Sequence, residues 1–135
     1  MYRNHLAFRR AAQPFRINFD DVACGASFHQ CTYILCAKEP ALLAANAAAR
    51  EAFGKAEPGS PYMPHLSLLY SDVDDEGRQQ SAAAAVARLW GEGSGYDTLL
   101  PDGGFPAGSF SVWLTPVEDR SLQSWQRVAE FQLAG

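Results

Sequence analysis

The most informative stretch of the sequence is residues 61–70, Pro-Tyr-Met-Pro-His-Leu-Ser-Leu-Leu-Tyr. Within it, residues 65–68 alternate polar and apolar side chains, with the period of two that is typical of a half-buried β-strand. We therefore predict that His65 and Ser67 project from one face of a strand, while Leu66 and Leu68 project from the other.

An imidazole beside a hydroxyl suits phosphate chemistry. A histidine can give or take a proton near neutral pH, and a serine hydroxyl can donate a hydrogen bond to a phosphate oxygen. The His-x-Ser tripeptide is also common by chance, and a histidine at a strand end next to a solvent-facing serine has the same spacing. Taken alone, the tripeptide favours this second interpretation.

The whole ten-residue stretch, however, closely resembles the signature of the plant-type cyclic phosphodiesterases, which belong to the two-histidine phosphoesterase superfamily. Two looser similarities accompany it. Residues 22–35 resemble the strand-turn-strand segment of that family, with its Gly and its Gln-Cys pair, and residues 115–133 resemble its C-terminal hairpin. The resemblance covers roughly residues 16–135.

The resemblance implies an α+β fold with antiparallel sheets and two helices packed on them. The fold has two lobes, and each contributes one His-x-Thr/Ser motif to a shared cleft. One histidine acts on the attacking water, the other protonates the leaving oxygen, and the two hydroxyls hold phosphate oxygens, without metal, cofactor or covalent intermediate. The implied substrates are nucleoside 2′,3′-cyclic phosphates and ADP-ribose 1″,2″-cyclic phosphate, the latter arising in tRNA splicing and so in RNA metabolism.

Three residues of this sequence match the family's second motif. The resemblance makes His65 a catalytic acid/base group and Ser67 a phosphate-binding group, and Tyr70 matches a tyrosine that lines the phosphate site. Strict alternation would turn Tyr70 away from His65. Its assignment therefore requires a twist or a bulge at the end of the strand.

The family's first motif has no counterpart in this sequence. The N-terminal residues contain one histidine, His5, and Ala7 stands where the hydroxyl residue belongs. We expect an incomplete first lobe, which reflects either a truncated gene model or the loss of half the acid/base pair. A lone His-x-Ser motif could still bind a phosphate. His29 stands where the resemblance places an aromatic residue, and we expect it to fill that position. The alternative is that His29 replaces the missing histidine.

Length, composition and charge bound the class of protein. A chain of 135 residues with 47% hydrophobic side chains can bury the core of one domain. The net charge of −4 argues against a broad grip on long nucleic acid or an anionic membrane. We expect a basic, frayed or artefactual arm at residues 1–15 and a cyclic phosphodiesterase-like domain at residues 16–135. We see no transmembrane run or signal peptide, and we expect a cytoplasmic protein.

Three cysteines lie close together, at positions 24, 31 and 36. The odd number and the absence of a secretory signal indicate reduced thiols. Their spacing with His29 fits no zinc ribbon or finger, so we predict no metal site. We expect Cys31 and Cys36 to pack as small apolar residues.

The remaining pattern predicts the other elements. Strands are predicted at residues 16–22, 28–36, 110–114 and 126–133, the first two as an antiparallel hairpin, with a possible start of another at 96–100. A helix is predicted from Pro40 to Phe53, and a second one after a cap at Ser71 or Asp72, with Val86, Leu89 and Trp90 as its buried stripe. Residues 101–108 are predicted to form a loop, and Trp113 and Trp125 to lie in the core.

Overall fold

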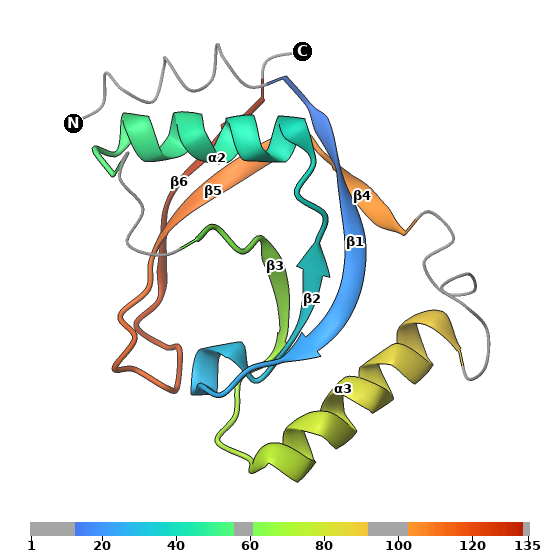
Figure 1. Cartoon of the computed structure of the whole chain (residues 1–135). Coiled ribbons are helices and arrows are strands. Elements are labelled where there is room, and N and C mark those ends of the chain that lie inside the picture. Colours follow the sequence, from blue (N-terminus) through green and yellow to red (C-terminus); the bar gives the residue numbers. More distant parts are fainter. Residues whose placement is uncertain (1–12, 56–60, 92–102, 134–135) are drawn as a thin grey trace. The chain divides into compact units, whose positions relative to one another are not determined.

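The computed structural model describes residues 13–55, 61–91 and 103–133. These residues belong to two compact units. The sheet unit comprises the described parts of Ile17–Lys38 and Pro61–Phe105, and the hairpin unit comprises those of Met1–Arg16, Glu39–Ser60 and Pro106–Gly135. Each unit combines antiparallel strands with one α-helix, so the fold is α+β as predicted (Figure 1).

A four-stranded sheet forms the centre of the sheet unit. Its strands are β1 (Phe15–Cys24), β2 (Thr32–Cys36), β3 (His65–Leu69) and β4 (Gly104–Ala107), in the spatial order β3-β2-β1-β4. Strand β2 pairs antiparallel with both β1 and β3, which confirms the predicted first hairpin. Because β2 has a neighbour on each side, its β-branched Thr32 and Ile34 are only 1% exposed.

The predicted strand at residues 28–36 begins later than expected. Phe28–Gln30 form a short 3₁₀ helix, η1, and the strand starts at Thr32. Gly25 permits the tight turn before η1. Its N–H donates to the Gln30 carbonyl oxygen at 2.8 Å, and a Cβ on residue 25 would lie only 2.5 Å from that oxygen. Cys31 and Cys36 are buried, which confirms the packing predicted for them.

Helix α3 (Asp75–Trp90) also belongs to the sheet unit. Its N-cap is Asp74 rather than Ser71 or Asp72, because the Asp74 carboxylate accepts a hydrogen bond of 2.9 Å from the Gly77 N–H at the third helical position. The predicted stripe was also wrong in part, since Val86 is exposed and Leu89 is half-buried. The side chain of Trp90 lies outside the described residues.

The hairpin unit contains α2 (Pro40–Ala52), β5 (Ser109–Leu114) and β6 (Gln126–Gln132). Helix α2 begins with proline in its first turn, as predicted. The two strands pair antiparallel, and Phe110 stacks on Phe131 with ring centroids 4.9 Å apart. Leu133 is buried in a cluster with aromatic and small side chains: Phe15, Ala45, Ala48, Ala49, Ala52 and Phe110.

The C-terminal third of the chain differs from the prediction at the loop and at one tryptophan. Strand β4 occupies part of the predicted loop at 101–108, and Gly104 allows this because any Cβ there would collide with the Ile17 carbonyl of β1. Trp113 is 52% exposed, so its core assignment was wrong, whereas Trp125 is half-buried and its indole donates to the Pro116 carbonyl at 3.2 Å. The possible strand at 96–100 lies outside the described residues.

None of the helices in the described ranges is long and apolar enough to cross a membrane.

Candidate functional site

Strand β3 presents the imidazole and the hydroxyl together. In the register between β2 and β3, His65 lies opposite Leu35 and Ser67 lies opposite Tyr33. Residues two apart on a strand share a face, and directly opposed residues of paired strands do too. His65 and Ser67 therefore project from the same face, as the alternation predicts, with Cα atoms about 7 Å apart at a rise of about 3.4 Å per residue.

The end of β3 carries the irregularity that the assignment of Tyr70 requires. Ser67 pairs with Tyr33, but Leu69 pairs with the residue just before Tyr33 on β2, so Leu68 is an extra residue. Such a bulge changes which face the following side chains occupy. Leu69, which pairs with Thr32, thus lies on the face opposite to Ser67. Tyr70 follows the last residue of β3, and alternation continued by one residue would turn it toward the face of Ser67.

A small hollow lies at this bulge. It has a volume of about 110 Å³ and is lined by Ser67, Leu68, Leu69 and Tyr70. One water molecule occupies about 30 Å³ in the liquid. The hollow therefore has room for a small polar group such as a phosphate.

The imidazole of His65 is held by the chain just before it. Its Nδ1 lies 2.8 Å from the Met63 carbonyl oxygen. A carbonyl can only accept, so this hydrogen bond requires the hydrogen to be on Nδ1. In the neutral ring Nε2 then carries the lone pair and is the nitrogen that remains able to accept a proton.

An aromatic ring also contacts this imidazole. The Tyr33 ring meets the His65 ring edge to face, with centroids 5.3 Å apart and an interplanar angle of 62°. Tyr33 belongs to the central strand and is buried, whereas His65 is exposed. The His65 imidazole thus rests on the sheet while one side of it stays open to solvent.

The segment that enters β3 is fixed to the end of β2. The Cys36 N–H donates to the Pro64 carbonyl at 3.0 Å, and Pro64 is buried. Burial raises the pKa of the Cys36 thiol and that of the Tyr62 phenol, and a charge on Cys36 would raise the pKa of Tyr62 further. Both groups are therefore neutral at physiological pH, and we assign them no part in proton transfer.

His29 belongs to η1, and its ring lies beside that of Tyr70. Its ring centroid is 5.4 Å from that of Tyr70 and 4.9 Å from that of Phe28, both with edge-on geometry. The Ser71 N–H donates to the Phe28 carbonyl at 3.1 Å, which ties η1 to the end of the motif. These contacts are those of an aromatic packing position, and they also place a second imidazole next to a site residue.

Arg78 braces the same region from α3. Its Nε donates to the Val73 carbonyl at 2.9 Å, and one terminal nitrogen donates to the Gly25 carbonyl at 2.5 Å. The guanidinium thereby joins the start of the helix to the turn that leads into η1. Sequence reasoning missed this residue, because an arginine in a helical pattern is typical of a solvated face.

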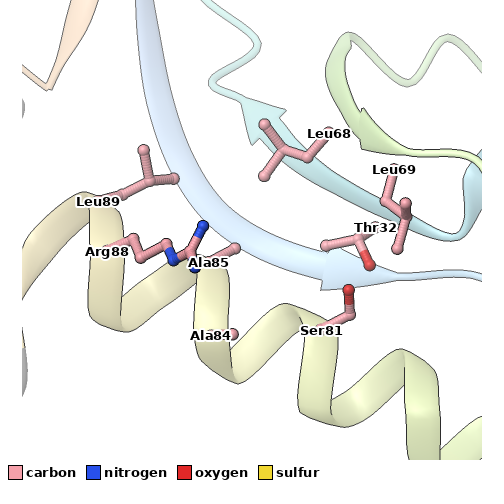
Figure 2. Close-up of a pocket in the computed structure, with 8 residues that line it drawn as sticks. All are labelled: Thr32, Leu68, Leu69, Ser81, Ala84, Ala85, Arg88 and Leu89. Atoms are coloured by element: carbon pink, nitrogen blue, oxygen red, sulfur yellow. The ribbon is translucent and has the colours of Figure 1, made fainter.

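The larger hollow of the sheet unit lies between α3 and the sheet. It measures about 410 Å³, and Figure 2 shows side chains of the helix and the sheet facing it: Thr32, Leu68, Leu69, Ser81, Ala84, Ala85, Arg88 and Leu89. Leu69 and Thr32 pair on the face opposite to Ser67. The described residues that line this hollow include no histidine and no carboxylate, whereas the His65 face carries an imidazole. We therefore place the candidate site on the His65 face.

Comparison with known proteins adds the family. Residues 4–133 match the family model described as cyclic phosphodiesterase-like protein. The chain belongs to this family. It is also similar to a cyclic phosphodiesterase of Arabidopsis thaliana, with 29% identity over 117 residues, which cover 87% of this chain and 60% of that relative. The resemblance predicted from residues 61–70 is confirmed, and the chain spans about 60% of the length of the curated relative that it matches.

Two features of the site in this cyclic phosphodiesterase-like chain were not foreseen. The sequence marked Tyr33 only as a strand former, because its contact with His65 depends on the register between two strands. The Met63 carbonyl carries no side-chain signal at all. The roles of His65, Ser67 and Tyr70 in binding and catalysis stay predictions.

Proposed function

We propose that this chain hydrolyses small cyclic phosphates to phosphomonoesters, with His65 as an acid/base group. The observation that carries the proposal is the pairing of the His65 imidazole and the Ser67 hydroxyl on one face of β3, in a chain of the cyclic phosphodiesterase-like family. Ser67, but not His65, also lines the hollow of about 110 Å³. As substrates we propose nucleoside 2′,3′-cyclic phosphates and ADP-ribose 1″,2″-cyclic phosphate.

The reaction needs two proton transfers. The oxygen of a water molecule bonds to phosphorus and gives up a proton, while one ring P–O bond breaks and the departing oxygen takes up a proton. The attacking and leaving oxygens lie roughly in line on opposite sides of phosphorus. A single imidazole therefore serves one of the two transfers, through Nε2, while Nδ1 keeps its hydrogen bond to the Met63 carbonyl.

Ser67 and Tyr70 would bind the phosphate itself. Both border the small hollow at the bulge, and each hydroxyl can donate one hydrogen bond to a non-bridging oxygen. Negative charge on these oxygens changes as the reaction proceeds, so fixed donors can favour the transition state over the bound substrate.

A second candidate function is the binding of a phosphate or nucleotide without turnover. The sequence holds one His-x-Ser triplet and no His-x-Thr triplet, since His5 and His29 are followed by other residues at that spacing. Loss of one proton-transfer group costs about 10²–10⁴ in rate. Under this alternative Ser67 still contributes to affinity.

Phosphorus NMR separates the two functions. We would incubate the full chain with each cyclic phosphate and follow the monoester signal, with His65→Ala and Ser67→Ala purified in the same way. Hydrolysis predicts product with the natural chain and a rate at least about 100-fold lower with His65→Ala. Equal turnover of both proteins would remove His65 from the mechanism. Binding without product, weakened by Ser67→Ala, would support the second candidate.

The variant His29→Phe tests the imidazole that lies beside Tyr70. Phenylalanine keeps the ring contacts with Phe28 and Tyr70 and removes the titratable group. If His29 is an aromatic packing residue, this variant turns over cyclic phosphate as fast as the natural chain. A loss as large as that of His65→Ala would instead make His29 the second proton-transfer group.

A further inference from the structure

We propose that Tyr33 is a positioning residue, which holds the His65 imidazole in the orientation needed for proton transfer. The inference rests on the proposed function of His65 and extends it to the neighbouring strand. It concerns the orientation of the ring and assigns Tyr33 no contact with the substrate.

The register places Tyr33 next to both motif side chains. It lies directly opposite Ser67, and His65 is its diagonal neighbour two residues along β3. Diagonal side chains on paired strands lie about 7–8 Å apart at the backbone, a distance that aromatic rings can bridge. The ring centroids of Tyr33 and His65 are 5.3 Å apart, so the two rings do meet.

Tyr33 is well suited to act as a fixed support. It is 8% exposed and sits on β2, which is hydrogen-bonded to a strand on each side. His65 is exposed and belongs to the outermost strand of the sheet. The rigid partner of the pair is therefore the tyrosine, and the imidazole takes its orientation from it.

The two contacts of His65 restrain different motions. The hydrogen bond from Nδ1 to the Met63 carbonyl selects the tautomer, but one hydrogen bond still allows the ring to tilt about it. The edge-to-face contact at 62° opposes that tilt. An aromatic pair of this kind changes an equilibrium by a factor of roughly 2–12, which we assign to the population of the productive orientation.

The test compares Tyr33→Leu, which removes the ring, with Tyr33→Phe, which keeps it. Two readouts are used on the full chain: steady-state hydrolysis of a nucleoside 2′,3′-cyclic phosphate, and the ¹⁵N chemical shifts of the His65 ring. We expect Tyr33→Leu to lower kcat by up to about tenfold with little change in KM. We also expect its ¹⁵N shifts to move from one tautomer toward an average, and Tyr33→Phe to keep both properties.

Phe19→Leu is the matched control. Phe19 also lies in this sheet and forms an aromatic pair, with the Phe105 ring at 6.0 Å and 55°, but it is not one of the residues of the candidate site. In the His65→Ala background, Tyr33→Leu should cause no further loss of kcat, because the imidazole that it orients is gone. If Tyr33→Leu fails to fold, Tyr33→Ile replaces it, since β-branched residues favour strands.

Unchanged ¹⁵N shifts in the folded Tyr33→Leu or Tyr33→Ile protein, together with a kcat equal to that of Phe19→Leu, would overturn the proposal. An equal loss of kcat with and without His65 would overturn it too. If the natural chain shows no turnover, the proposed function fails, but the ring shifts still decide whether Tyr33 orients His65.

Discussion

Replacement of Arg78 by methionine should destabilise the protein, because the guanidinium links α3 to the turn before η1. Its two short hydrogen bonds, of 2.9 Å to Val73 and 2.5 Å to Gly25, both reach backbone carbonyls. A third contact, to the Ser27 carbonyl at 3.5 Å, is weak. Methionine keeps much of the side-chain length and cannot donate any of these bonds.

The expected loss follows from the two short bonds. A hydrogen bond to a charged group contributes about 1.5–3 kcal/mol. Arg78 is half-buried, so water can replace part of this interaction. Two such bonds would contribute about 3–6 kcal/mol in a fully buried site, and the partial exposure lowers the loss that we expect for the Arg78→Met variant to about 2 kcal/mol, out of a total of about 5–15 kcal/mol for a typical domain. Arg78→Lys, which keeps the charge and one donor group, should lose about half as much.

Urea denaturation of both variants measures this loss directly, and the melting temperature should fall by about 6–8 °C for Arg78→Met. Hydrogen exchange adds a local readout at the Ser71 amide, which bonds to Phe28 of η1 and should exchange faster when the turn loosens. Arg127→Met is the matched control, because Arg127 forms an exposed ion pair with Glu130 at 2.7 Å and should cost less than about 1 kcal/mol. An Arg78→Met variant within about 0.5 kcal/mol of the natural chain would refute the bracing role.

Three further outcomes are expected. Gly25→Ala should lower the free energy of unfolding, measured in urea, by about 1–3 kcal/mol, because the added Cβ would lie 2.5 Å from the Gln30 carbonyl oxygen. The control Gly108→Ala should be neutral, because a Cβ there meets no atom within 4 Å, and equal effects of the two variants would contradict the argument. Asp119 accepts hydrogen bonds from the N–H and hydroxyl groups of Ser121 and Ser124, which lower the pKa of its carboxyl group. The ionised carboxylate should therefore stabilise the folded protein fully above the ordinary pKa of 3.8, and this stabilisation should decline as the pH falls below that value. Thermal melts of Asp119→Asn should thus differ from the natural chain more at pH 7 than in acid, and a constant difference would argue against the carboxylate. Finally, a thiol reagent should label the exposed Cys24 before the buried Cys31 and Cys36, as followed by mass spectrometry of the intact protein. Fast labelling of all three cysteines would contradict the burial of Cys31 and Cys36.

The sequence predicted those parts of the site that depend on local periodicity. Two-residue alternation along 65–68 was enough to place His65 and Ser67 on one face, since side-chain direction in a strand needs no knowledge of its neighbours. The helix that begins at Pro40 was predicted for the same reason, from spacing along one segment. Both follow from backbone geometry within a few residues.

The missed features depend on pairing between segments. The assignment of Tyr70 called for a twist or a bulge at the end of the strand, but its position at Leu68 could not be predicted, because β2 fixes where Ser67 and Leu69 pair. The contact of Tyr33 with His65 has the same origin. The exposure of Trp113 shows the complementary error, because a strand pattern gives the alternation of faces but not what covers each face.

Chemical rescue of His65→Gly tests the central claim most directly. If the imidazole of His65 transfers a proton to or from a cyclic phosphate substrate, this variant should hydrolyse a nucleoside 2′,3′-cyclic phosphate at least about 100-fold more slowly. Added imidazole should then raise its rate in proportion to concentration, while Ser67→Ala shows no such response. Turnover by His65→Gly at the rate of the natural chain, with or without imidazole, would contradict the account.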